Sequence, residues 1–266
     1  MLANKLRVTR VTWAVGFSAL AYTFYYCFNS GEWIWLLGMY AYYKIVSLFS
    51  NNIALHRYFS HRAFKAKNKL THYFLCFVSI LVGQDTPILY ASGHRHHHKY
   101  SDQEKDIHSP KTSSRFDLLI WSLRPSSWYV ETKQVRIAKD LLGDKGALFV
   151  HRFYLPIWMA FSTLVYFIFG WKVLVFMVLP CIALNVIHME LFRITYLHRT
   201  FPGNYKNFND TDEHSQNNIW LQAVDTGEGL HNNHHKYPNR YDQAVQPWEH
   251  DPSAVFIKYL LAKKET

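Results

Sequence analysis

The sequence predicts an all-α membrane protein in which four transmembrane helices form two hairpins under a cytoplasmic helical cap. Three observations lead to this fold class. Four long apolar runs fall into two closely spaced pairs. Lys and Arg flank the runs on one side, whereas the turns within the pairs carry almost none, which makes the basic side cytoplasmic. Three histidine clusters fall on that same side, where the cap could unite them in one di-metal site.

The first predicted hairpin contains spans at about residues 11–28 and 33–55. Lys5, Arg7 and Arg10 precede the first run, as in a signal peptide. No small-residue cleavage site follows, and a second apolar run begins almost at once, so we expect a retained span. A short turn joins the two runs, and the second run ends directly in a histidine.

The remaining predicted elements follow the same reasoning. The apolar stretch at about residues 70–83 is shorter than the roughly 20 residues that a span needs. If it crossed the membrane, the first two histidine clusters would lie on opposite faces, so we expect an interfacial or re-entrant segment. The second hairpin contains spans at about 148–169 and 171–194. Amphipathic stretches at 128–142 and near 254–262 complete the helices of a single domain, residues 1–266.

Composition narrows the class of partner. The chain is 49% hydrophobic and 17% aromatic, which fits a membrane protein with interfacial aromatic belts. Its formal charge is +10, but the basic residues are scattered around apolar runs and form no nucleic-acid motif. We therefore expect a lipid bilayer and a phosphate-bearing substrate, and no nucleic acid. All 3 cysteines lie in apolar runs without a Cys-x-x-Cys motif, which indicates buried free thiols.

The histidine clusters carry the chemistry. His94, His97 and His98 are spaced i, i+3 and i+4, so on a helix their rings leave from one face, while His96 points the opposite way. The same spacing recurs at His231, His234 and His235. Neutral imidazoles are good ligands for iron, zinc, copper and nickel. Three such clusters in one chain favour a transition-metal site over solvated histidine-rich loops.

The first cluster has a different spacing. His56 and His61 are five residues apart, and on an α-helix their side chains point about 140° apart. The pair can reach one site only if it straddles the direction of approach, or if the helix loosens after Ser60.

Together the clusters form the pattern H-x4-H, H-x2-H-H, H-x2-H-H. With this pattern the chain resembles the membrane fatty-acyl desaturases, specifically the Δ9-type acyl-CoA desaturase branch. The matching stretches are residues 54–62, 94–102, 106–110 and 227–235. The resemblance implies two iron ions held by eight cluster histidines and a ninth from the end of the last span. The implied ligands are His56, His61, His94, His97, His98, His198, His231, His234 and His235.

The ninth ligand has two candidates. The stretch at residues 215–218 keeps the family's distance to His231, which favours His198. His188, preceded by Asn185, is the competing candidate. The family's Asn one turn before the ninth histidine, which holds a metal-bound water, has no match here because Ile194 stands at that position.

Three carboxylates are candidates for orienting these imidazoles. Asp102 and Asp106 would accept the second ring N–H of a ligand, the alternative being a solvated acidic turn. Glu228 has the same candidate role, the alternative being a helix N-terminal charge. The remaining histidines are expected to lie at interfaces or in loops without partners, except for His108, which adjoins the site. That group comprises His72, His151, His214 and His250.

The resemblance implies an O2-dependent reaction that removes two hydrogens from adjacent methylenes of a long acyl chain and leaves a cis double bond. The acyl group would be linked to CoA, to a carrier protein or to a lipid. The chain has no Cys ligands for an iron–sulfur cluster and no room for a cytochrome domain, so we expect a separate electron donor of the ferredoxin or b-type cytochrome class. We also expect Arg57, Arg95 and Lys99 near a phosphate-bearing head group.

Two other functions remain open. One is a related histidine-box hydroxylase or monooxygenase acting on carotenoids, sterols or alkanes. The tripeptide Gly227-Glu228-Gly229, just before the last cluster, favours the desaturase over these hydroxylases. The other is a non-catalytic membrane protein that binds metal or haem, but paired haem ligands normally lie in the core of a span. The compact chain favours a bacterial inner membrane, whereas a C-terminal dilysine pattern, Lys263 and Lys264, fits the endoplasmic reticulum.

Overall fold

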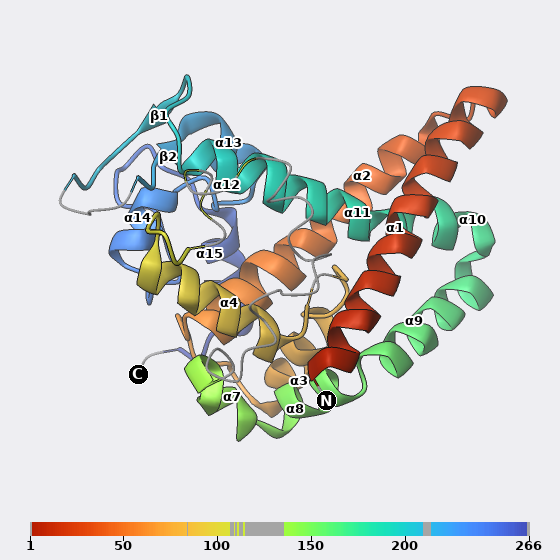
Figure 1. Ribbon diagram of the computed structural model, residues 1–266, viewed down its shortest axis with the longest axis horizontal. Helices are drawn as coiled ribbons and strands as arrows, with labels where there is room; N and C mark the ends of the chain where they lie inside the picture. Colours follow the sequence, from red (N-terminus) through yellow and green to blue (C-terminus); the bar gives the residue numbers. More distant parts are fainter. Residues whose placement is uncertain are drawn as a thin grey trace.

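The protein is largely helical, which confirms the all-α class (Figure 1). The computed structural model describes residues 2–83, 85–106, 109, 111, 114, 136–209 and 214–264. Within these residues the strands are limited to a short antiparallel pair, β1 (Asn204–Tyr205) and β2 (Asn217–Asn218), in the register Asn204 to Asn218.

The first predicted hairpin is present. Helix α1 (Leu2–Ser30) turns at Gly31, whose φ of 74° lies in the left-handed region. Helix α2 (Ile34–Val46) then runs back and continues into the π-helix η1 (Ser47–Ser60). Tyr26 and Trp35 both donate hydrogen bonds to Glu32 in the turn, which ties the two helices together there.

The second predicted hairpin is also present. Helix α9 (Tyr154–Phe169) ends at Gly170, whose φ is 84°. The return helix is almost continuous from Trp171 to Leu197. It comprises α10 (Trp171–Val173), η5 (Leu174–Val178), α11 (Pro180–Val186), η6 (Ile187–Arg193) and α12 (Ile194–Leu197).

The two hairpins meet along their lengths and at their turns. Helix α1 packs against α11, and both turns lie at the right of Figure 1, far from α14. Lys172 after one turn forms an ion pair of 3.1 Å with Glu32 of the other. The helix Trp171–Leu197 is long and apolar enough to cross a bilayer. The helices Lys145–Arg152 and Tyr154–Phe169 are long and apolar enough only when taken together, and they are bent by 75° at the break between them. The four spans therefore remain a prediction.

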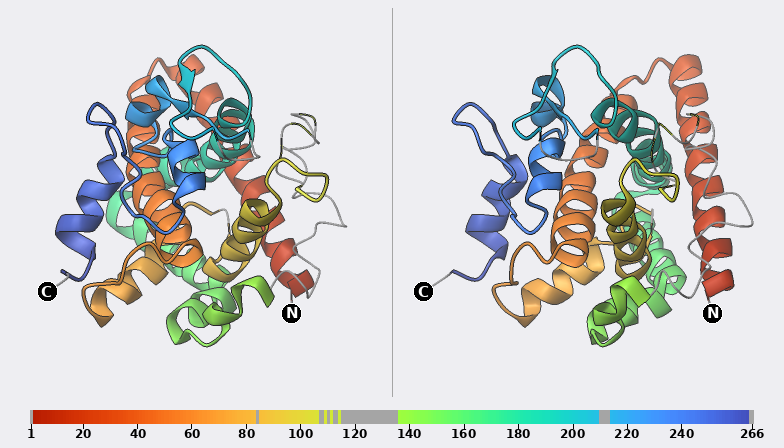
Figure 2. Two further views of the ribbon diagram at one scale, coloured as in Figure 1. Left: turned by 90° about the vertical axis from the view of Figure 1, so that its left-hand side faces the viewer. Right: turned by 60° about the vertical axis from the view of Figure 1, so that its left-hand side comes forward.

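Shorter helices surround the ends of the hairpins opposite to the turns. They are α3 (Lys69–Val78), α4 (Pro87–Tyr100), η4 (Arg136–Ala138), α7 (Lys139–Leu142), α8 (Lys145–Arg152), α13 (Ile219–Val224), α14 (His231–Lys236), α15 (Pro252–Phe256) and η7 (Ile257–Leu261). In the right-hand view of Figure 2, η1 and α4 lie between the C-terminal helices and α1. The main apolar core lies beside them and includes Ile53, Leu75 and Ile182.

Three predicted stretches fall among these shorter elements. The segment expected at 70–83 forms α3 and ends at Val78, followed by turns. The C-terminal amphipathic helix is found as α15 and η7. In the stretch predicted at 128–142, residues 128–135 lie outside the described residues. Residues 136–142 form η4 and α7.

A glycine sets the distance between α1 and α11. A Cβ atom at Gly16 would lie 2.8 Å from the Cβ of Ile182. We expect Gly16→Ala to lower the thermal unfolding midpoint of the detergent-solubilised protein by several degrees, although alanine favours helices intrinsically, because overpacking costs about 1–3 kcal/mol. Gly143→Ala is the matched control, since its Cβ would lie 3.7 Å from the nearest backbone atom. A midpoint for Gly16→Ala at or above that of wild type would contradict this packing.

Candidate metal centre

Helix α4 presents the second histidine cluster from one face. It begins with Pro87 at its first turn, where a missing N–H costs nothing, and runs alongside η1 (Figure 1). The Nε2 atoms of His94 and His98 lie 3.1 Å apart, as the i, i+4 spacing predicts. His97 is buried on the neighbouring part of the same helix, whereas the ring of His96 lies against that of Tyr100 at an angle of 51°.

The π-helix η1 explains the spacing of the first cluster. In such a helix each N–H donates to the carbonyl five residues earlier. The N–H of His61 donates to the carbonyl of His56 at 3.2 Å, and their ring centroids lie 5.0 Å apart. Residues five apart therefore share a face. Of the two arrangements left open by the sequence, the structure shows a loosened helix, and the widening covers Ser47–Ser60 instead of following Ser60.

The third cluster lies on α14, and the segment just before this helix is tightly folded. Gly227 has a φ of 102°, and a Cβ there would lie 2.1 Å from Asp251. A Cβ at Gly229 would lie 2.2 Å from the backbone nitrogen of Gln222. Both positions therefore require glycine. Asn217 of β2 accepts hydrogen bonds from the first backbone N–H groups of α14 and fixes its start.

The structure brings the nine predicted histidines together in two groups. One group contains His56, His61, His94, His98 and His234, and the other contains His97, His198, His231 and His235. The Nε2 atom of His234 lies 3.0 Å from those of His56 and His98, and the Nε2 atoms of His198 and His231 lie 2.9 Å apart. Two nitrogens bound to one ion at about 2.1 Å and at right angles lie about 3.0 Å apart. The donor spacing therefore fits two metal ions.

Burial favours the neutral form of five of these imidazoles. It lowers the pKa values of His61, His94, His98, His231 and His234 well below the ordinary histidine value, and neighbouring imidazoles lower them further. The neutral form has a free lone pair for a metal at neutral pH.

Carboxylates lie behind several of the rings. The Nδ1 atom of His97 lies 2.8 Å from Asp106, and that of His198 lies 3.0 Å from Asp102. Glu228 is buried, with an oxygen 2.6 Å from Nδ1 of His56. A carboxylate on Nδ1 holds a proton there and directs Nε2 toward the centre. All three carboxylates singled out in the sequence thus contact a histidine of the two groups.

The neighbours His56 and Arg57 keep Glu228 charged. Burial alone would raise the pKa of Glu228, but His56 and Arg57 outweigh it and hold that pKa below its ordinary value. The guanidinium of Arg57 lies 3.0 Å from Glu228 and 2.7 Å from Asp251, and donates to the carbonyl of Tyr241. This ion-pair network was missed in the sequence, because its members are far apart along the chain.

Arg57 and Arg95, expected near a phosphate-bearing head group, use their guanidinium groups for contacts inside the protein. Arg57 is buried within the network above, with 1% of its side chain exposed. Arg95 donates to Asp140 and to the carbonyl oxygens of Ser60 and Phe59, so its donors are used inside the protein. Lys99 is exposed, and its role stays a prediction.

His188 lies outside both histidine groups. Its Nδ1 atom lies 2.5 Å from the hydroxyl of Tyr43, and its Nε2 atom lies 3.6 Å from Asp225. Asp225 in turn accepts two hydrogen bonds from Arg193, at 2.7 and 2.8 Å. The structure therefore groups His198, and not His188, with the clusters.

Two histidines expected to lack partners have them. His151 lies 2.7 Å from the hydroxyl of Thr86, and His72 lies 2.9 Å from that of Tyr58. The expectation was wrong for both because their partners come from other helices. The backbone N–H groups of the other two also have acceptors, Asp102 for His214 and Gln222 for His250. His108 lies outside the described residues.

No sequence pattern predicted that Gln243 would contact a histidine of the centre. The side-chain amide of Gln243 lies 3.2 Å from Nδ1 of His234. Amide nitrogen and oxygen are assigned from their surroundings, and the opposite orientation would let the oxygen accept the ring proton. Gln243 then orients His234 as the carboxylates orient the other rings.

Comparison with known proteins identifies the family. The chain matches the fatty acid desaturase family over residues 33–252. It belongs to the fatty acid desaturase family. It is 30% identical over 212 residues to a probable chloroplastic lipid desaturase, ADS3.2, of Arabidopsis thaliana, covering 79% of this chain and 56% of that protein. It is also 30% identical to the acyl-CoA C20 Delta5-desaturase of Anemone leveillei (83% and 69% covered) and to the sn-2 palmitoyl-lipid 9-desaturase of a Nostoc species (80% and 74%). The chain thus spans 56–74% of the length of these relatives.

Removing the buried arginine tests the network behind the centre. Arg57→Met leaves Glu228 and Asp251 buried without their cation, so we expect a loss of about 3–5 kcal/mol in the free energy of unfolding. Thermal unfolding of the purified protein would measure it. Arg62→Met is the control, because that side chain is 61% exposed. Equal unfolding midpoints for the two variants would show that the network contributes no stability.

Proposed function

We propose that the chain is a fatty-acyl desaturase whose nine histidines hold two iron ions. One observation carries the proposal: nine buried or half-buried imidazoles converge in groups of five and four, in a chain that belongs to the fatty acid desaturase family. The donor set fits this metal, because imidazole suits iron and the nitrogen spacings fit ligands of one ion. The proposed ligands are the nine histidines predicted from the sequence, with His198 as the ninth.

Bound iron would supply the activation of O2 that removes two hydrogens from adjacent methylenes, forming a cis double bond and water. The protein's own residues position the donors. Asp102, Asp106 and Glu228 hold protons on Nδ1 and thereby direct Nε2 inward. Arg57 holds Glu228 in turn. The burial of the rings excludes water from the site, which protects it from side reactions.

We further propose that the two hairpins span a bilayer four times. Large apolar side chains are exposed on the helices expected to face lipid, including Phe28 at 71%, Leu37 at 65% and Phe167 at 77%. Soluble monomers rarely expose apolar surface on this scale. The ion pair between Glu32 and Lys172 supports a topology with both turns on one side. In this proposal the histidines face the other, basic side, which the positive-inside rule makes cytoplasmic. A bacterial inner membrane is favoured, with the endoplasmic reticulum as the alternative.

The substrate proposed is a long acyl chain, and electrons come from a separate ferredoxin or b-type cytochrome. The names of the relatives include both acyl-CoA and acyl-lipid desaturases, so the head group is left as CoA, carrier protein or lipid. A related hydroxylase remains the alternative within the histidine-box enzymes, and it would form a hydroxylated product. A non-catalytic haem protein would show a Soret absorption band.

Expression in a desaturase-deficient host tests the activity. We expect the wild-type chain to restore unsaturated fatty acids in the profile of methyl esters, and His97→Ala to lose at least 99% of that product because a ligand is removed. His250→Ala is the control, since that exposed residue lies outside both histidine groups. Hydroxylated products, or unsaturation that persists in His97→Ala, would contradict the proposal.

Metal content tests the ninth ligand. We expect His198→Ala to lose about one of two iron ions per chain, because it removes one of the four donors in the smaller group. His188→Ala should retain both ions, since His188 contacts Tyr43 and Asp225. Iron would be quantified by elemental analysis of purified protein. The reverse result would assign the ninth ligand to His188.

A further inference from the structure

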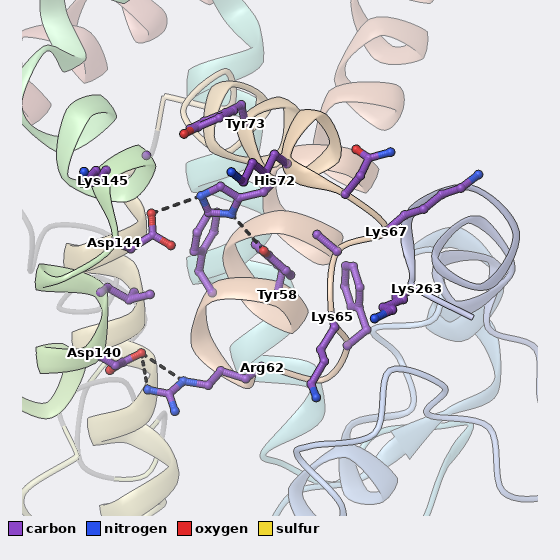
Figure 3. A pocket seen from close by; sticks show the side chains of 17 residues that line it. Tyr58, Arg62, Lys65, Lys67, His72, Tyr73, Asp140, Asp144, Lys145 and Lys263 are labelled. Carbon is purple, nitrogen blue, oxygen red and sulfur yellow. Dashed lines mark hydrogen bonds and ion pairs between the residues drawn. The ribbon is translucent and has the colours of Figure 1, made fainter. Parts of the chain in front are cut away.

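A third group of metal-binding side chains lies outside the histidine centre, beside an open cleft of about 890 Å³ (Figure 3). His72 and Cys76 stand one turn apart on α3, and Asp144 caps the start of α8. In Figure 3, His72 lies between Tyr58 and Asp144, with the cleft in front of it. Cys76 is buried behind the cleft, with 2% exposed.

The three donor atoms have the spacing of zinc ligands. The Nε2 atom of His72 lies 3.6 Å from the Sγ of Cys76 and 3.2 Å from an oxygen of Asp144. A zinc ion about 2.3 Å from sulfur and about 2.1 Å from nitrogen, at a tetrahedral angle, sets these two atoms about 3.6 Å apart. The corresponding nitrogen-to-oxygen distance is about 3.4 Å.

The surroundings fit a metal as well. The Nδ1 atom of His72 lies 2.9 Å from the hydroxyl of Tyr58, a partner of the kind that orients metal-binding imidazoles. A Cβ at Gly146 would lie 2.7 Å from the sulfur of Cys76 and 2.8 Å from Nε2 of His72. The absence of a side chain at Gly146 leaves free the space in front of the donor atoms.

We propose that His72, Cys76 and Asp144 bind a zinc ion whose fourth ligand comes from the cleft. Three protein ligands with one open position are typical of zinc sites that exchange a ligand. Lys65, Lys67, Lys145 and Lys263 line the cleft. Their positive charge favours an anion, such as hydroxide or phosphate, as the fourth ligand. The site is independent of the histidine centre and of the proposed desaturation.

The competing explanation is a hydrogen-bonded chain from Tyr58 through His72 to Asp144 that only joins α3 to α8. Zinc stoichiometry separates the two. The purified, reduced full-length protein would be loaded with zinc chloride, desalted and analysed for metal. Cys76→Ser, His72→Gln and Asp144→Asn remove one donor each, and asparagine preserves the helix cap. Cys181→Ser is the matched control, a buried thiol outside the three candidate clusters of described residues.

We expect the wild type and Cys181→Ser to retain one more zinc ion per chain than Cys76→Ser, His72→Gln and Asp144→Asn. Cobalt in place of zinc should show thiolate-to-metal charge-transfer absorption in the wild type and Cys181→Ser, and the three donor variants should lose it. Equal zinc content in all variants, or a cobalt spectrum unchanged by Cys76→Ser, would overturn the site. Unfolding midpoints measured without metal identify any variant that fails to fold, and Asp144→Asn then serves as the second test.

Discussion

The constraint that shapes this structure is the placement of many neutral imidazole nitrogens about 3 Å apart inside a buried volume. Bare nitrogen lone pairs repel when they converge, and burial removes the water that would otherwise solvate them. The rings must therefore be held from behind. Asp102, Asp106 and Glu228 do so through Nδ1.

The local irregularities of the backbone serve this placement. On a regular α-helix the side chains of His56 and His61 would point about 140° apart. The π-helix η1 brings them onto one face, with a hydrogen bond from the N–H of His61 to the carbonyl of His56. The lead into α14 packs against Gln222 so closely that only Gly229 fits. Each of these features costs helical regularity or conformational entropy. Their presence in one small region indicates that the packing around the histidines determines the local backbone.

Much of the centre could be predicted from the sequence because its spacing signals are local. The i, i+3, i+4 pattern of His94, His97 and His98 is visible in five residues, and the helix hairpins follow from long apolar runs. The partners of Arg57 could not be predicted in this way. Glu228 and Asp251 lie far along the chain, and a basic residue beside a histidine box is as compatible with a surface role as with a buried ion pair.

For the same reason, the contacts of His72 and Gln243 could not be predicted from the sequence. A lone histidine on an amphipathic helix carries no periodic signal, so its contacts with Tyr58 and Asp144 emerge only when α3 meets η1 and α8. Gln243 lies nine residues after His234 in a stretch without helical spacing. The histidines proposed as ligands on α4 are thus readable from their spacing along one helix. The contacts of Gln243 and of His72 are readable only once the helices are assembled.

The charge distribution around the histidines links metal binding to folding. Imidazole donors bring no negative charge to a bound cation, so the nearest negative charge lies on the carboxylates behind them. Hydrogen bonds from His198 and Ser109 hold the pKa of Asp102 below its ordinary value although burial would raise it, so it is ionised at neutral pH. Cations in the centre would be attracted to this buried charge and would bind the folded chain in preference to the unfolded one, which stabilises the fold by mass action. The carboxylates thus contribute both the geometry of the rings and the charge that favours occupied sites.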